Sequence, residues 1–244
     1  LVNNAGIHLK KPALETSEDE FIAVFNTHVH GDHWLGNHGI CEVYPDVPIY
    51  AHQNAIERIN AGEGDFWIGV FSRMTNGAVD GTKVVAPNIG LKGGETLKLD
   101  DLTLRIHHTG HAHSDNDIMI EVVDDKGLFF GDVVTEKQVP NSDVPQDANF
   151  KGAIAAIKTM LQGESTLFIP GHGRTGGREV PEAALRFLEE LYAAVTKYFK
   201  EGLLDYEMKD KILQQMAQYK DWNNFSEMGR VISFVYREVE TENF

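Results

Sequence analysis

The sequence predicts an α/β fold in which two β-sheets are flanked by helices. Residues 83–134 are rich in short strands, because apolar side chains alternate along 97–99 and 102–106 and a hairpin turn is expected at 124–127. Most of the chain after residue 150 instead shows apolar residues at helical spacing. In addition, several predicted strands end in short loops that carry histidine or aspartate.

Each predicted element follows from a local pattern. Apolar runs bounded by glycine, proline or aspartate indicate strands, and apolar residues three or four positions apart indicate helices. Pro181 suits the first turn of a helix, because its backbone lacks an N–H group. The predicted strands, in chain order, end at 26–27 or cover 48–51, 84–85, 97–99, 102–106, 118–123, 128–134 and 167–169. The predicted helices follow a turn at 36–39, begin near 55, or cover 150–161, 181–200, 204–218 and 228–239.

The length and charge of the chain limit its organisation and its partners. With 244 residues, we expect one α/β domain over 1–244, with an atypical N-terminal segment at 1–27 and a helical C-terminal region at 181–244. The chain carries 37 acidic and 22 basic residues, a formal net charge of −15, which repels nucleic acid and anionic membranes. We therefore expect a soluble protein with a small-molecule substrate, no nucleic-acid partner and no membrane partner; a homodimer is left open.

Cysteine usage and apolar runs add further expectations. Cys41 is the only cysteine of the sequence, which excludes an internal disulfide and a cysteine-based zinc cluster. No apolar run reaches the roughly 20 residues that cross a bilayer, and the first residues show no signal-peptide pattern. We expect a cytoplasmic protein, or a periplasmic one if a leader has been removed ahead of Leu1.

The densest polar motif is an H-x-H-x-D-H sequence at 28–33. It brings three imidazoles and one carboxylate within six residues, and Zn²⁺ prefers such nitrogen and oxygen ligands. The alternative is a histidine-rich surface loop without a function, which the ordered spacing disfavours. We therefore interpret His28, His30, Asp32 and His33 as metal ligands on a tight loop that follows a strand.

Three later motifs continue this pattern. Residues 110–114 contain His113 and run into the apolar strand 118–123. The apolar strand 128–134 contains Asp132, and residues 166–173 end in Pro-Gly-His-Gly, which includes His172.

In this order, the four motifs resemble those of the metallo-β-lactamase superfamily, with a ligand set similar to that of glyoxalase II. The resemblance implies an αββα sandwich of two mainly antiparallel or mixed sheets flanked by helices, in which little room is left for the first sheet. It also implies two zinc ions as cofactors, with iron or manganese as alternatives. One metal would be held by His28, His30 and His113, the other by Asp32, His33 and His172, and Asp132 would bridge the two.

The function that the resemblance implies is that of a zinc-dependent hydrolase with a metal-bridging hydroxide. Asp32 is expected to orient the nucleophile as the catalytic carboxylate. An aspartate at position 132 resembles thioesterases and lactonases more than the β-lactamase subgroup that has cysteine there, which favours an ester, thioester or lactone over a β-lactam. Two alternatives remain: a mononuclear iron oxidoreductase similar to persulfide dioxygenase, and a metal-binding protein with impaired catalysis.

The N-terminal segment resembles another family. Residues 1–29, which begin Leu-Val-Asn-Asn-Ala-Gly-Ile, are similar to an internal segment of short-chain dehydrogenases. We do not expect a working dehydrogenase, because the glycine-rich dinucleotide loop and a Tyr-x-x-x-Lys pair are missing from the sequence. Either the first sheet is truncated, or the chain is a chimera joined near 26–29.

The remaining histidines and one apolar segment have less specific roles. We expect His52, His107, His108 and His111 to support packing or to lie at the surface, with His111 the nearest competitor of His113 for the ligand role. Residues 62–81 are too apolar for an ordinary linker, so they either pack against the edge of the sandwich or form a wall of the substrate pocket.

Overall fold

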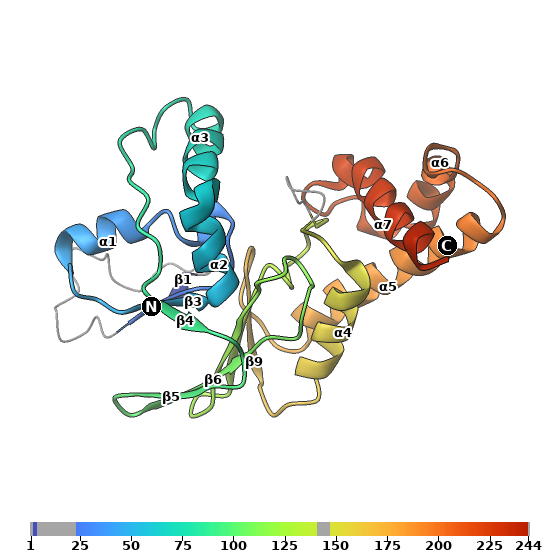
Figure 1. Cartoon of the computed structure of the whole chain (residues 1–244). Coiled ribbons are helices and arrows are strands. Elements are labelled where there is room, and N and C mark those ends of the chain that lie inside the picture. Colours follow the sequence, from blue (N-terminus) through green and yellow to red (C-terminus); the bar gives the residue numbers. More distant parts are fainter. Residues whose placement is uncertain (1, 4–22, 141–146, 244) are drawn as a thin grey trace. The chain divides into compact units, whose positions relative to one another are not determined.

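The structure is a computed structural model that describes residues 2–3, 23–140 and 147–243 (Figure 1). The chain divides into two compact units. Unit 1 comprises residues 1–108 and 116–131, and unit 2 comprises residues 109–115 and 132–244. The expectation of a single domain over 1–244, with its N-terminal and C-terminal subdivisions, stays a prediction.

Unit 1 contains a parallel sheet and an antiparallel sheet. The strands of the parallel sheet follow chain order, and their register pairs Val24 with Ile49 and Tyr50 with Ile89. The antiparallel strands form a meander in which Ile120 pairs with both Ile106 and Phe129. The parallel strands are β1 (Val2–Asn3), β2 (Val24–Asn26), β3 (Ile49–His52) and β4 (Ile89–Leu91). The antiparallel strands are β5 (Thr96–Leu99), β6 (Leu102–His107), β7 (Met119–Val122) and β8 (Gly127–Gly131).

The two sheets of unit 1 share one apolar core. Successive side chains of a strand point to opposite faces, so Phe25 of β2 lies in the cluster that also contains Ile106 and Ile120 of the antiparallel sheet. The neighbouring Val24 instead joins Ile49 in a second cluster, which is covered by α1 (Asn37–Val43). The layers of unit 1 are therefore helix, sheet and sheet, which confirms the predicted α/β class with sheets flanked by helices.

The segment with two interpretations, residues 62–81, is mostly a helix that packs against the histidine-rich loop. After α2 (Gln53–Arg58) and η4 (Ile59–Glu63), the chain forms α3 (Gly64–Met74). Trp67 of α3 is 4% exposed, and its ring lies 4.9 Å from the ring of His30. The helix thus supports a ligand loop.

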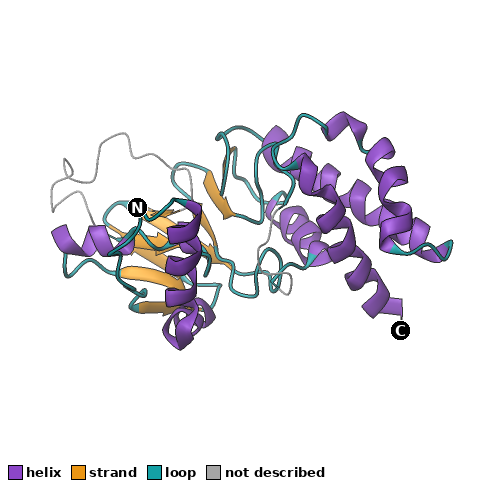
Figure 2. Ribbon diagram, turned by 90° about the horizontal axis from the view of Figure 1, so that it is seen from above, coloured by secondary structure: helices purple, strands orange, loops and turns teal. Residues whose placement is uncertain are grey.

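Unit 2 is mainly helical (Figure 2). Buried residues recur at helical spacing along its longest helix, as at Phe187, Leu191 and Val195. None of the helices among the described residues is both long and apolar enough to cross a bilayer. Its main elements are α4 (Phe150–Met160), β9 (Leu167–Pro170), α5 (Glu179–Lys200), α6 (Asp205–Gln215) and α7 (Met228–Asn243), with single turns η5 (Ala217–Tyr219) and η6 (Phe225–Glu227).

One predicted strand is wrong. Residues 84–85 form no strand, and β4 lies instead at Ile89–Leu91, after Pro87. The carbonyl of Val85 accepts a hydrogen bond from the side chain of Asn37 rather than from a neighbouring strand. Val85 therefore packs against the apolar cluster under α1 instead of joining a sheet, because local strand preference is easily overridden by tertiary contacts.

The close contact between α3 and the histidine-rich loop can be tested by substitution of glycine. A Cβ atom added at Gly31 would lie 2.9 Å from the Cβ of Trp67, whereas one added at Gly39 in α1 would meet nothing within 4 Å. We expect Gly31→Ala to lower the free energy of unfolding by about 1–3 kcal/mol through overpacking, and Gly39→Ala to raise it by about 0.5–1 kcal/mol. Urea unfolding of both variants checks this, and equal shifts would contradict the packing.

Candidate metal centre

The histidine-rich loop of unit 1 brings its imidazoles together directly after β2. A single 3₁₀ turn at Gly31–His33 reverses the chain, so the rings of His28 and His33 have centroids 4.0 Å apart, and those of His28 and His30 4.6 Å apart. Asp32 Oδ2 lies 3.5 Å from His33 Nε2. His28, His30 and His33 are at most 6% exposed. Unit 1 therefore gathers the four ligands predicted on this loop.

The hydroxyl of Thr27 orients two of these rings. Its oxygen lies 2.9 Å from Nδ1 of His33 and 3.3 Å from Nδ1 of His28. A neutral imidazole has one N–H group and one lone pair. When Nδ1–H donates to the hydroxyl, the lone pair of Nε2 is the one that can bind a metal, which is the arrangement that supports histidine ligands in metal sites.

Buried amides hold the backbone of the loop. Asn26 donates from Nδ2 to the carbonyl of His33 at 2.9 Å, and Asn37 donates to Oδ1 of Asn26 at 2.8 Å. The N–H of Val29 donates to Oδ1 of Asn116 at 2.9 Å, and the indole N–H of Trp34 donates to the carbonyl of Val29 at 2.8 Å. These bonds fasten one arm of the turn to β2 and the other to the segment before β7.

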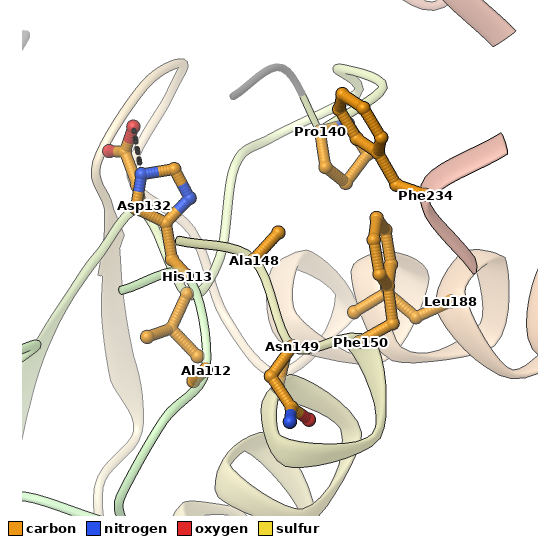
Figure 3. A pocket seen from close by; sticks show the side chains of 11 residues that line it. Ala112, His113, Asp132, Pro140, Ala148, Asn149, Phe150, Leu188 and Phe234 are labelled. Carbon is orange, nitrogen blue, oxygen red and sulfur yellow. Dashed lines mark ion pairs between the residues drawn. The ribbon is translucent and has the colours of Figure 1, made fainter. Parts of the chain in front are cut away.

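In unit 2, one carboxylate oxygen faces two imidazoles. Oδ2 of Asp132 lies 3.2 Å from Nε2 of His172 and 3.8 Å from Nε2 of His113, and Figure 3 shows the contact with His113 as a dashed line. The side chain of Asp132 is 11% exposed. Unit 2 therefore gathers the other three predicted ligands around a single oxygen atom.

Main-chain hydrogen bonds position the three loops that carry these ligands. The N–H of Asn149, at the start of α4, donates to the carbonyl of Ala112, next to His113, at 2.7 Å. The N–H of Gly171 donates to the carbonyl of Val134 at 2.9 Å, and the carbonyl of His172 accepts from the N–H of Glu136 at 2.8 Å. The loop of His172 thus runs alongside the segment that follows Asp132.

The donors of both units fit a zinc site. Imidazole nitrogens and carboxylate oxygens are the donors that Zn²⁺ takes besides thiolates. In each unit they approach one another closely, in positions from fully buried to about a third exposed. The assignment of the seven residues to two metals stays a prediction.

Three other histidines, His52, His108 and His111, have structural partners among the described residues. His111 Nε2 makes a short contact with the carbonyl of Asp147, so its imidazole is used in holding the loop of His113. His108 donates from Nδ1 to the carbonyl of Asp117 at 2.8 Å and stacks on His52. Nδ1 of His52 in turn accepts a hydrogen bond from the N–H of Asn54, so His52 is the N-cap residue of α2.

The sequence patterns did not identify the residues whose side chains support the histidine-rich loop. Asn26 and Thr27 follow three apolar residues, 23–25, and are 0% and 1% exposed. Two consecutive polar residues at the end of a buried strand, directly before a ligand motif, are a sequence pattern that could have indicated this supporting role. Asn37 carries no such local signal, because its partner Asn26 is 11 residues away.

A comparison with protein families identifies the fold family. The model of the metallo-beta-lactamase superfamily matches residues 4–172, more than half of the chain. The chain belongs to the metallo-beta-lactamase superfamily. The family match begins at residue 4, so it includes most of the segment that resembles short-chain dehydrogenases, and no comparison supports that second resemblance. Residues 4–22 lie outside the described residues.

Solved structures of this family share the fold. A metallo-beta-lactamase from Pontibacter korlensis aligns with a TM-score of 0.51 and 19% identity over 69% of each chain. The BLEG-1 B3 metallo-beta-lactamase aligns with a TM-score of 0.54 and 22% identity over 68% of this chain and 77% of its own. The DIM-1 metallo-beta-lactamase exposed to ceftazidime has a TM-score of 0.53 and 18% identity over 69% of this chain and 67% of its own. No curated protein matches the sequence.

The role of Thr27 can be separated from simple packing. We expect Thr27→Val, which keeps the shape but removes the hydroxyl between two imidazoles, to weaken zinc affinity by about 10- to 100-fold, and Thr27→Ser to restore it. Thr196→Val is the matched control, because Thr196 Oγ1 is buried without a hydrogen-bond partner among the described residues. Chelator competition measures the affinities. Equal zinc affinity in Thr27→Val and the unsubstituted protein would contradict the orienting role.

Proposed function

We propose that the chain is a dinuclear zinc-dependent hydrolase that cleaves an ester, a thioester or a lactone. The observation that carries the proposal is the geometry of Asp132, whose Oδ2 lies within 4 Å of both His113 Nε2 and His172 Nε2. A carboxylate that faces two imidazoles suits a bridging ligand. Membership of the metallo-beta-lactamase superfamily supports metal-dependent hydrolysis as the general class.

The proposed ligand sets follow the family pattern. Asp132 belongs to both sets. The first zinc ion would be held by His28, His30 and His113, and the second by Asp32, His33 and His172.

Bound zinc would supply a Lewis acid, which makes water nucleophilic near neutral pH and polarises a substrate carbonyl. The side chains have their own tasks. Asp32 is about a third exposed, so its carboxylate can accept a hydrogen bond from the attacking water and take its proton at Oδ2. Thr27 holds two imidazoles in orientation, and Trp67 covers His30.

The choice of substrate rests on position 132. An aspartate there resembles the thioesterases and lactonases of the family, so we propose an ester, a thioester or a lactone ahead of a β-lactam. A small-molecule substrate, the lack of nucleic-acid and membrane partners, the open question of a homodimer and a cytoplasmic location stay predictions from charge and sequence.

Metal analysis is the first test. The protein loaded with zinc and dialysed should retain two zinc ions per chain, because the proposed ligands suffice for two four- or five-coordinate sites once water completes them. Hydrolysis of a panel of chromogenic esters, thioesters, lactones and a cephalosporin identifies the substrate class. One iron per chain in the protein as purified, no more than one zinc ion per chain after loading, and no hydrolysis would instead favour the dioxygenase alternative.

Asp132→Asn tests the bridge. The substitution keeps the shape of the side chain but removes its charge, so we expect loss of one of the two zinc ions and a fall in hydrolysis of roughly 10- to 100-fold or more. Asp125→Asn is the matched control, because Asp125 lies on the exposed hairpin turn between β7 and β8. This variant should keep both zinc ions and the full rate of hydrolysis. Retention of two zinc ions and full turnover in Asp132→Asn would refute the bridging role.

A further inference from the structure

Unit 2 contains a small cavity beside two of its proposed ligands. Its volume is about 40 Å³. Figure 3 shows His113 and Asp132 on one side of this cavity and the side chains of Phe150, Leu188 and Phe234 on the other. A polar end at the proposed metal centre and an apolar opposite end suit a molecule with the same division.

The residues that line the cavity disfavour a charged ligand. Apart from His113, Asp132 and Asn149, the described residues that line it are apolar, and none is lysine or arginine. Arg230 lies over the ring of Phe234 at 5.4 Å and is not among the lining residues. A carboxylate on the ligand would therefore find no cationic partner among the described residues that line the cavity, and its burial there would be unfavourable.

The walls of the cavity are fixed to the loop of His113. Asn149 caps α4 by accepting a hydrogen bond from the N–H of Gly152 at 2.6 Å, while its own N–H donates to the carbonyl of Ala112 at 2.7 Å. Glu238 of α7 accepts from the N–H of Phe150 at 2.8 Å and from that of Lys151 at 2.9 Å. Burial raises the pKa of the Glu238 carboxyl, and these two N–H donors act against that rise.

These bonds connect the elements that carry Phe150 and Phe234 to the residue next to His113. The distance from the apolar end of the cavity to the polar end is thereby set by the main-chain hydrogen bond between Asn149 and Ala112 and by the Glu238 carboxylate, which accepts from two main-chain N–H groups of α4. A cavity with a fixed depth can discriminate between chains of different length.

We propose that this cavity binds the acyl chain of the substrate, an uncharged aliphatic chain of about four to six carbons. The inference rests on the proposed function, because the reacting carbonyl is taken to lie at the His113 and Asp132 end. A water-sized group needs about 10–15 Å³ on this measure of volume, so the cavity holds on the order of three such groups beyond the carbonyl. Its apolar end stabilises each buried methylene.

The first experiment measures kcat/KM for p-nitrophenyl esters from acetate to dodecanoate with the zinc-loaded protein. We expect a rise of about fourfold for each methylene that enters the cavity, up to a maximum at four to six carbons. Ala148→Leu should fill the cavity and remove the preference for the longer of these chains. Phe234→Ala should enlarge it and move the maximum to longer chains, and it serves if Ala148→Leu fails to fold.

The second experiment measures binding without turnover. Hexanamide carries the same chain but is a poor substrate, and ligand-detected NMR reports its binding. We expect binding to the zinc-loaded protein, a loss of at least tenfold in Ala148→Leu, and no binding of adipic acid monoamide, which adds a terminal carboxylate. Phe199→Ala is the matched control, because Phe199 contacts Tyr236 rather than the cavity, and it should change neither measurement.

The outcomes separate the two proposals. Hexanamide binding that depends on position 148, with no ester hydrolysed, would support the cavity and overturn the hydrolase. Ester hydrolysis without chain-length dependence, with hexanamide binding unchanged in Ala148→Leu, would overturn the cavity and leave the hydrolase standing. Neither hydrolysis nor hexanamide binding would overturn both.

Discussion

The buried amide and hydroxyl groups under the histidine-rich loop must be hydrogen-bonded, because an unsatisfied polar group in an apolar core costs about 1–3 kcal/mol. Asn26, Thr27 and Asn37 are each at most 1% exposed, and they meet this requirement by bonding to one another, to the carbonyl of His33 and to imidazole nitrogens. The ligand loop is therefore held by the fold of unit 1. A metal would enter a set of donors that is already oriented.

In unit 2 the same task falls mainly to the main chain. The loops of His113 and His172 are held by main-chain carbonyl and N–H groups of Ala112, Asn149, Val134 and Glu136. The side chains near Asp132 can therefore act as metal ligands or line the apolar cavity. This difference explains why the supporting residues of unit 2 include alanine and valine. Their backbone groups do the positioning, so their side chains are free to pack.

Much of the site was readable from the sequence because its ligands stand in short local motifs. The four predicted ligands at 28–33 converge in unit 1, and His113, Asp132 and His172 converge in unit 2. The hairpins of the antiparallel sheet and the helices α4, α5 and α7 also follow local periodicity.

The misses depend on contacts between distant residues. The valines at 84–85 show strand preference, but Val85 packs under α1 and bonds to Asn37, which is 48 residues away. The short strand β4 contains a glycine, Gly90, and pairs with β3 across some forty residues, so no local pattern marks it. The role of α3 was open because the contact of Trp67 with His30 joins two segments that are separate in sequence.

The most direct test of a preformed dinuclear centre is X-ray absorption at the zinc edge of the fully loaded protein. The account predicts a first shell of nitrogen and oxygen at about 2.0–2.1 Å and a metal–metal distance of about 3.5–4 Å. It also predicts no sulfur in the shell, because the one cysteine, Cys41, packs in the apolar cluster under α1. A spectrum of isolated zinc ions without metal–metal scattering, or one with a sulfur ligand, would contradict it.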